Sequence, residues 1–292
     1  MRFAIAYSKK DLAGKNIVNQ LKKISFIPQT PIIELKPRKI SKNLDFPGPE
    51  NSKNFLGKET IFSEDLSPKN YPKLRNIDFL VFASKHQSEK KENSLCLHAP
   101  GNWRNADFGG QSGKICNTSA LILKYLFKQL NKNTEFAKDN NQLDKDYNIT
   151  LEVTHHGPLT EIPCCFIEVG SQEQEWRDEQ ACKIIAKTIL SLQNYKPNKN
   201  LIPCIGIGGP HYAPNFNKIQ LNSDYAISHI IPEYVLPLTE SMLKQAEEKT
   251  KEQIKFVLLD WKGLGKSEQR QQTISLLNKF NLKYKRTSHI EK

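Results

Sequence analysis

The stretch 152–170, EVTHHGPLTEIPCCFIEVG, constrains the fold more than any other part of the chain. Two apolar runs of strand length lie on either side of a His-His-Gly-Pro turn. The first run ends on His155 and His156, and the second carries one carboxylate, Glu168, near its end. We expect the two strands to bring these three side chains to nearly the same place. Imidazole and carboxylate groups are ligands that zinc prefers in proteins.

A second strand-like run, 201–207, leads into two glycines and the pair His211-Tyr212. Glycines after a strand let a ligand approach the backbone, so the N–H groups of Gly208 and Gly209 can bind an oxyanion or a phosphate. The spacing matches neither the dinucleotide-binding fingerprint nor the P-loop. The alternative is a plain tight turn, which leaves His211 without an explanation.

Two further histidines also follow predicted strands. His86 comes shortly after the apolar run 77–83, and His98 closes the run 94–98. Each of them alone is about as easily a hydrogen-bonded structural residue as a metal ligand. Together with the three histidines named above, they place five of the chain's seven histidines at strand ends. Chance explains that placement poorly, so the five histidines predict a common site.

Strand-like and helix-like segments alternate along the chain. This alternation predicts the α/β class, as a three-layer fold with a largely parallel or mixed central sheet and helices on both faces. Ligand sites in such sheets form beyond the carboxyl ends of the strands. The predicted helices cover 11–23, 112–130, 172–191, 239–251 and 266–280, and further strands cover 2–8, 32–35, 224–231 and 256–260.

The chain is predicted to form one α/β catalytic domain over residues 1–292. Residues 36–74 are polar and rich in proline, which indicates an irregular excursion rather than a separate domain. The polar stretch 131–146 is interpreted as a surface loop, and 283–292 as a basic tail.

The formal net charge of +12 favours a polyanionic partner, although a lysine-rich composition alone also produces such a charge. The six cysteines form no CxxC pair, the N-terminus does not read as a signal peptide, and no apolar run is long enough to span a membrane. We therefore expect a cytoplasmic protein without structural disulfides and without a membrane partner. No predicted helix has an apolar surface that a second copy of the chain would need to cover, so a monomer is expected.

Five sequence blocks carry a resemblance to a known family. In chain order they are SKHQS (84–88), LHAPGNW (97–103), THHGP (154–158), FIEVGS (166–171) and GIGGPHYAP (206–214). The chain resembles the archaeal and plant type of D-aminoacyl-tRNA deacylase, a zinc-dependent family, over nearly its whole length. The THHGP and GGxHYAP blocks are the most specific. The family often has a small or polar residue where Pro210 stands, which affects the local turn.

The resemblance implies a fold akin to phosphorylase and peptidyl-tRNA hydrolase proteins. It also implies hydrolysis of the ester in D-aminoacyl-tRNA by zinc-activated water, which releases free D-amino acid and tRNA as a form of chiral proofreading. One or two zinc ions are expected. The ligands would be His155, His156, His211 and His98; the catalytic residues Glu168 and His156; the substrate contacts His86, Gly208, Gly209, Tyr212, Asn102 and Trp103.

Two alternatives stay open. One is a metal-independent esterase that acts like peptidyl-tRNA hydrolase, which would be insensitive to chelators. The other is a non-enzymatic tRNA-binding protein whose histidines are structural, which would bind tRNA without releasing an amino acid.

Overall fold

The computed structural model describes residues 1–24, 30–36, 38–39, 59–60 and 66–290. Most of the excursion predicted at 36–74 therefore lies outside the described residues. Within the described part, two short antiparallel strands, β3 (Arg38–Lys39) and β4 (Glu59–Thr60), pair with each other. A 3-10 turn, η2 (Pro72–Leu74), leads back towards the main sheet.

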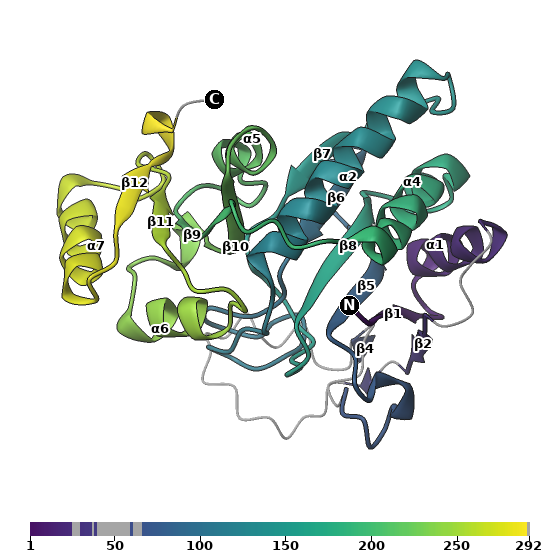
Figure 1. Ribbon diagram of the computed structural model, residues 1–292, viewed down its shortest axis with the longest axis horizontal. Coiled ribbons are helices and arrows are strands. Elements are labelled where there is room, and N and C mark those ends of the chain that lie inside the picture. Colours follow the sequence, from purple (N-terminus) through teal and green to yellow (C-terminus); the bar gives the residue numbers. More distant parts are fainter. Residues whose placement is uncertain (25–29, 37, 40–58, 61–65, 291–292) are drawn as a thin grey trace.

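The strands form two main sheets rather than one (Figure 1). The first sheet has six strands in the order β2-β1-β5-β8-β6-β7. β6 runs antiparallel to β8, whereas all other neighbours are parallel, so the predicted mixed sheet is confirmed. The bounds are β1 Phe3–Ser8, β2 Ile32–Leu35, β5 Phe79–Lys85, β6 Ser94–His98, β7 Asn148–Leu151 and β8 Cys164–Gly170.

The second sheet has four parallel strands in the order β10-β9-β11-β12. Its two faces are both covered by helices, because its side chains pack alternately against α6 and α7 and against α2 and α5. This arrangement is the expected three-layer one. The bounds are β9 Ile202–Ile207, β10 Tyr225–Ile231, β11 Phe256–Leu259, β12 Tyr284–Arg286, α5 Pro214–Asn222, α6 Glu240–Glu248 and α7 Ser267–Lys279.

Helices cover one face of the first sheet. Side chains such as Ile5, Val81 and Ile167 meet α1 (Leu12–Lys23), α2 (Ala120–Asp139) and α4 (Glu179–Leu190) in the main core. The residues between them in the strands, including Phe82 and Phe166, pack against side chains from loops and from η2. The loop-covered face is where the polar residues gather.

The helix predicted over 112–130 is displaced in the sequence. It begins at Ala120, where Ser119 caps it by accepting a hydrogen bond from the Ile122 N–H group, and it continues to Asp139. The predicted loop 131–146 was therefore wrong over its first half. Residues 283–292, predicted to be a tail, contain β12 and a 3-10 turn. Among the described residues, none of the helices combines the length and apolar character needed to cross a membrane.

Candidate active site

The site lies on the loop-covered face of the first sheet, where β6 and β7 end and beside the carboxyl end of β5. Glu168 of β8 is level with Ser84 of β5 on one side and with Cys96 of β6 on the other. Two residues earlier in β8, Phe166 is opposite His98 of β6, and their rings stack with centroids 5.2 Å apart. Side chains two apart in a strand share a face, so this register groups Glu168, Cys96 and His98.

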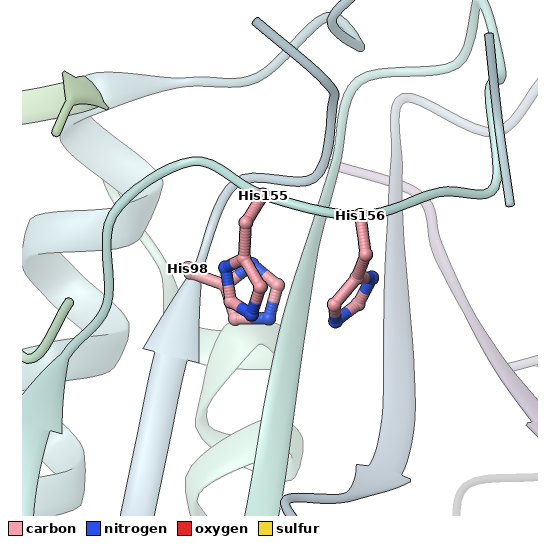
Figure 2. Close-up of side chains that lie close together, drawn as sticks. All are labelled: His98, His155 and His156. Carbon is pink, nitrogen blue, oxygen red and sulfur yellow. The ribbon is translucent and has the colours of Figure 1, made fainter. Parts of the chain in front are cut away.

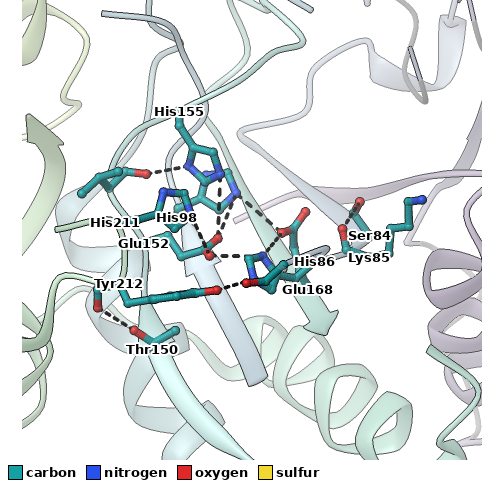
Figure 3. A network of polar contacts seen from close by, with 12 residues as sticks. Ser84, Lys85, His86, His98, Thr150, Glu152, His155, Glu168, His211 and Tyr212 are labelled. Carbon is teal, nitrogen blue, oxygen red and sulfur yellow. Dashed lines mark hydrogen bonds and ion pairs between the residues drawn. The ribbon is translucent and has the colours of Figure 1, made fainter. Parts of the chain in front are cut away.

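Glu152 is the centre of the site, although no role was assigned to it from the sequence. It follows β7 directly and is 2% exposed. Its Oε1 lies 3.2 Å from His86 Nδ1 and 3.2 Å from His211 Nε2. Its Oε2 lies 3.8 Å from His98 Nε2 and 3.9 Å from His155 Nε2. Figure 3 shows these histidines converging on the one carboxylate from several segments of the chain.

The loop after β7 presents both histidines of the doublet to the same space. Adjacent residues of a regular strand would point to opposite faces, but His156 has a φ of +42°, so the strand has ended. The N–H group of Gly101 donates hydrogen bonds to both histidine carbonyls and holds the loop. The ring centroids of His155 and His156 lie 4.4 Å apart, and that of His98 lies 4.2 Å from His155 (Figure 2).

The donor atoms of this cluster suit a metal ion. Four overlapping triplets each have ligand atoms within 4.8 Å of one another. His98 Nε2 and Glu152 Oε2 are buried and have no hydrogen-bond partner among the described residues. Unpaired buried polar atoms are costly, and two zinc–ligand bonds of about 2.0–2.1 Å can span the 3.8 Å between them. The triplets are His98-His155-His156, Glu152-His155-His211, His98-Glu152-Glu168 and His86-Cys96-Glu152.

Burial sets the protonation of the histidine doublet and of His98. Desolvation lowers the pKa of His98 to about 3, lowers that of His155 well below its usual range, and also lowers that of His156. Their neutral imidazoles are the form that binds a metal ion.

The pKa values of the two carboxyl groups, Glu152 and Glu168, are shifted in opposite directions. Burial raises the pKa of Glu168 to about 7, despite its hydrogen bond with His86. For Glu152, burial acts in the same sense, but the hydrogen bond from His211 and the charge of His86 outweigh it and lower the pKa to about 2. Two carboxylates with such different environments can take different roles, one as a permanent charge and one as a proton acceptor.

His86 links the buried cluster to the partly exposed Tyr212. Its Nε2 lies 3.0 Å from the Tyr212 hydroxyl, and its ring packs against Gly170, where a Cβ would come within 2.7 Å of two His86 atoms. Asp11 caps α1 and also accepts hydrogen bonds from Ser84 Oγ and the Lys85 N–H group, which fixes the end of β5 just before His86.

Three residues predicted to contact substrate donate hydrogen bonds to other groups of the protein. Asn102 donates a hydrogen bond to the Gly109 carbonyl, and the Trp103 indole donates one to the Ile230 carbonyl. The N–H group of Gly208 donates to the Ile231 carbonyl, so it is not free to bind an oxyanion. Gly208 and Gly209 have φ values of +93° and +83° and allow the turn that leads to His211.

Sequence reasoning missed Glu152 and Cys96 as site residues. Cys96 looked like a small hydrophobe in an apolar strand, because the register that places it beside Glu168 is not visible in the sequence. Glu152 had a signal, since it lies three residues before His155 on the same segment.

Comparison with known proteins places the chain among deacylases. A family model described as D-aminoacyl-tRNA deacylase matches residues 74–285. The D-aminoacyl-tRNA deacylase of Thermococcus onnurineus is 40% identical over 211 residues, which is 71% of this chain and 73% of the relative. That of Methanocaldococcus jannaschii is 30% identical over 275 residues, which is 92% and 94% of the two chains.

The crystal structure of a conserved protein of unknown function, AF0625, has the same fold. It superimposes with a TM-score of 0.75 over 99% of this chain and 96% of its own, at 21% sequence identity.

Proposed function

The chain belongs to the D-aminoacyl-tRNA deacylase family, and we propose that it hydrolyses the ester that joins a D-amino acid to the 3′ end of tRNA. The products are the free D-amino acid and tRNA. The observation that supports this proposal most strongly is the buried cluster in which one carboxylate, Glu152, faces four imidazoles. Such a set of donors is expensive to bury unless it binds or reacts with something.

We propose that the cluster holds one or two zinc ions. The ligands would be His98, His155, His156 and His211, the residues predicted from the sequence. We include Glu152 as a further ligand, because its buried Oε2 has no hydrogen-bond partner among the described residues. When bound there, zinc would polarise the ester carbonyl and lower the pKa of a water molecule.

The residues of the chain supply the proton transfers. Water attacks the carbonyl carbon, and the bond from that carbon to the ribose oxygen breaks. Glu168 accepts the proton that the water loses, and this proton ends on the ribose oxygen. His156 would serve as the second proton-transfer group only where it does not bind the metal, because its Nδ1 is already engaged with the Gly157 carbonyl. Glu168 suits the role because its carboxylate lies 3.8 Å from His86 Nδ1 and 3.9 Å from His98 Nε2.

The test is the release of tyrosine from D-Tyr-tRNA and from L-Tyr-tRNA by the purified protein. We expect release from the D-ester only. Equal release from both esters would indicate a general esterase or a relative of peptidyl-tRNA hydrolase. Binding of tRNA without release from either ester would favour a non-enzymatic RNA-binding protein.

A Glu168→Gln variant extends the test to the assigned base. We expect it to bind deacylated tRNA as the unaltered protein does and to lose turnover of the D-ester by roughly 10²- to 10⁴-fold. Glu173→Gln is the matched control, because Glu173 is exposed and, within the described part of the chain, forms an ion pair only with Arg177. Equal activity of the two variants would remove Glu168 from the reaction.

A further inference from the structure

Two aromatic side chains flank His86, and a lysine ammonium group lies over the ring of each. The Trp176 indole donates a hydrogen bond to the His86 carbonyl, while the Tyr212 hydroxyl meets the His86 ring. Lys85 Nζ lies 4.6 Å from the centroid of the Trp176 ring, and Lys90 Nζ lies 5.7 Å from that of Tyr212. We call Lys85, Trp176, Lys90 and Tyr212 the His86 rim. Figure 3 shows Tyr212 and Lys85 on either side of His86.

The rim is the accessible border of a buried site. Glu152, Glu168 and His98 are almost fully buried, whereas Tyr212 and Trp176 are half-buried and Lys90 is exposed. A substrate that reaches the cluster past His86 therefore passes the rim.

The lysines of the rim have no carboxylate in direct contact within the described residues, and the Lys85 ammonium acts on the buried Asp11 only through its charge. Neither Lys85 nor Lys90 forms an ion pair with another described residue, and the Lys85 ammonium has only a 3.3 Å hydrogen bond to the Gln87 side chain. The carboxylates on the same loop are Glu89 and Glu92, both exposed. Aromatic rings hold both ammonium groups in place and leave their N–H donors for an anion.

This arrangement fits the chemistry of a nucleotide esterified at its ribose. With the ester at the cluster, the 5′-phosphate of the same nucleotide lies one ribose away, at the mouth of the site. Resting on the proposed function, we propose that Lys90 binds the phosphate of the 3′-terminal nucleotide of the substrate RNA beside Tyr212. Lys85 on Trp176 extends the same surface to the preceding phosphate. Basic groups interleaved with aromatic rings are a common way to bind single-stranded RNA.

The first test compares two small probes, 5′-AMP and adenosine, which differ by one phosphate. Titration calorimetry measures their binding and requires no turnover. We expect the unaltered protein to bind 5′-AMP about tenfold more tightly than adenosine, as one charge-assisted contact provides. Lys90→Gln should reduce that ratio to near one, and Lys90→Arg should restore most of it.

Lys91→Gln is the matched control. Lys91 is the next residue of the same loop, is also exposed and has no aromatic ring beneath it among the described residues. We expect it to keep the tenfold ratio. Equal binding of the two probes by the unaltered protein, or an equal loss in both variants, would overturn the proposal, since the second result would reflect general charge and no particular contact.

The second test measures deacylated tRNA binding against salt concentration. Lys85→Gln and Lys90→Gln should each lower the slope of log affinity against log salt by about 0.7, the value for one phosphate contact on a single strand. Unchanged slopes would contradict the proposal. Preference for 5′-AMP in a protein that releases no D-tyrosine would refute the proposed function and leave the phosphate site standing. Release of D-tyrosine without that preference would support the proposed function and refute the phosphate site.

Discussion

The two sheets contribute to the site in different ways. The second sheet is covered by helices on both faces, and its contribution comes from a loop after β9, which brings His211 and Tyr212. The first sheet has one face covered by loops, and this face carries Glu168 and His98 within its strands. A site on a sheet face gains buried, rigid side chains, whereas a loop supplies partly exposed groups that complete it. The predictions below test that difference, beginning with the largest expected effect.

Loss of the central carboxylate should have the largest effect. Glu152→Gln keeps the shape of the side chain and removes the charge that faces four imidazoles. We expect kcat on the D-ester to fall by roughly 10³-fold, comparable to the loss of a major electrostatic group. Steady-state assays of D-Tyr-tRNA hydrolysis measure this. Activity near that of the unaltered protein would mean that Glu152 is only structural.

Loss of His211, which lies in the loop after β9, should lower activity less than loss of Glu152. His211 is about one-third exposed and pairs with the same carboxylate. We expect His211→Ala to lower kcat by roughly 10- to 100-fold, because the buried groups of the first sheet stay in place. The comparison of the two sheets would break down if this variant lost as much activity as Glu152→Gln in the same assay.

The close packing of Gly170 on His86 gives a prediction that depends only on the position of the His86 ring. A Cβ at residue 170 would come within 2.7 Å of the His86 ring, so Gly170→Ala should displace His86 and lower kcat about tenfold. Gly113→Ala is the control, because a Cβ there meets nothing within 4 Å. Its positive φ should cost about 1 kcal/mol of unfolding free energy without a change in kcat. Equal kcat in both variants would argue against a positioned His86.

The smallest effect on activity should come from a buried lysine between the sheets. Lys124 donates hydrogen bonds to the Gln220 and Tyr225 carbonyls, and burial lowers its pKa from 10.5 to about 8. Between these values the unfolded chain binds more protons at this residue, so stability rises with pH through the window from about 8 to 10.5. The gain is at most roughly 3 kcal/mol.

Urea unfolding at pH 7.5 and pH 10 measures that gain. The unaltered protein should gain stability relative to Lys124→Met between the two pH values, because the variant lacks the titrating group. Activity at neutral pH should be unchanged in the variant if its fold persists. A constant difference in stability would mean that Lys124 keeps an ordinary pKa.

The sequence predicted the histidines of the site better than its carboxylates. The five clustered histidines follow strands or lie in short turns, where motif and turn chemistry are visible. The role of Glu152 depends on three segments converging on it, and that of Cys96 on the antiparallel register of β6 and β8. Local sequence patterns predict neither the strand register nor the division into two sheets, because both depend on pairing between distant segments. The end of α2 was missed because polar residues continue its helix past residue 130.

The most direct test of the account is metal dependence of D-Tyr-tRNA hydrolysis, measured together with the zinc content of the protein. The account predicts that a chelator removes the zinc and stops release of tyrosine, and that added zinc restores both. It also predicts that Glu152→Gln retains less zinc than the control Glu173→Gln. Undiminished hydrolysis by protein shown to be free of metal would contradict it and favour a metal-independent esterase.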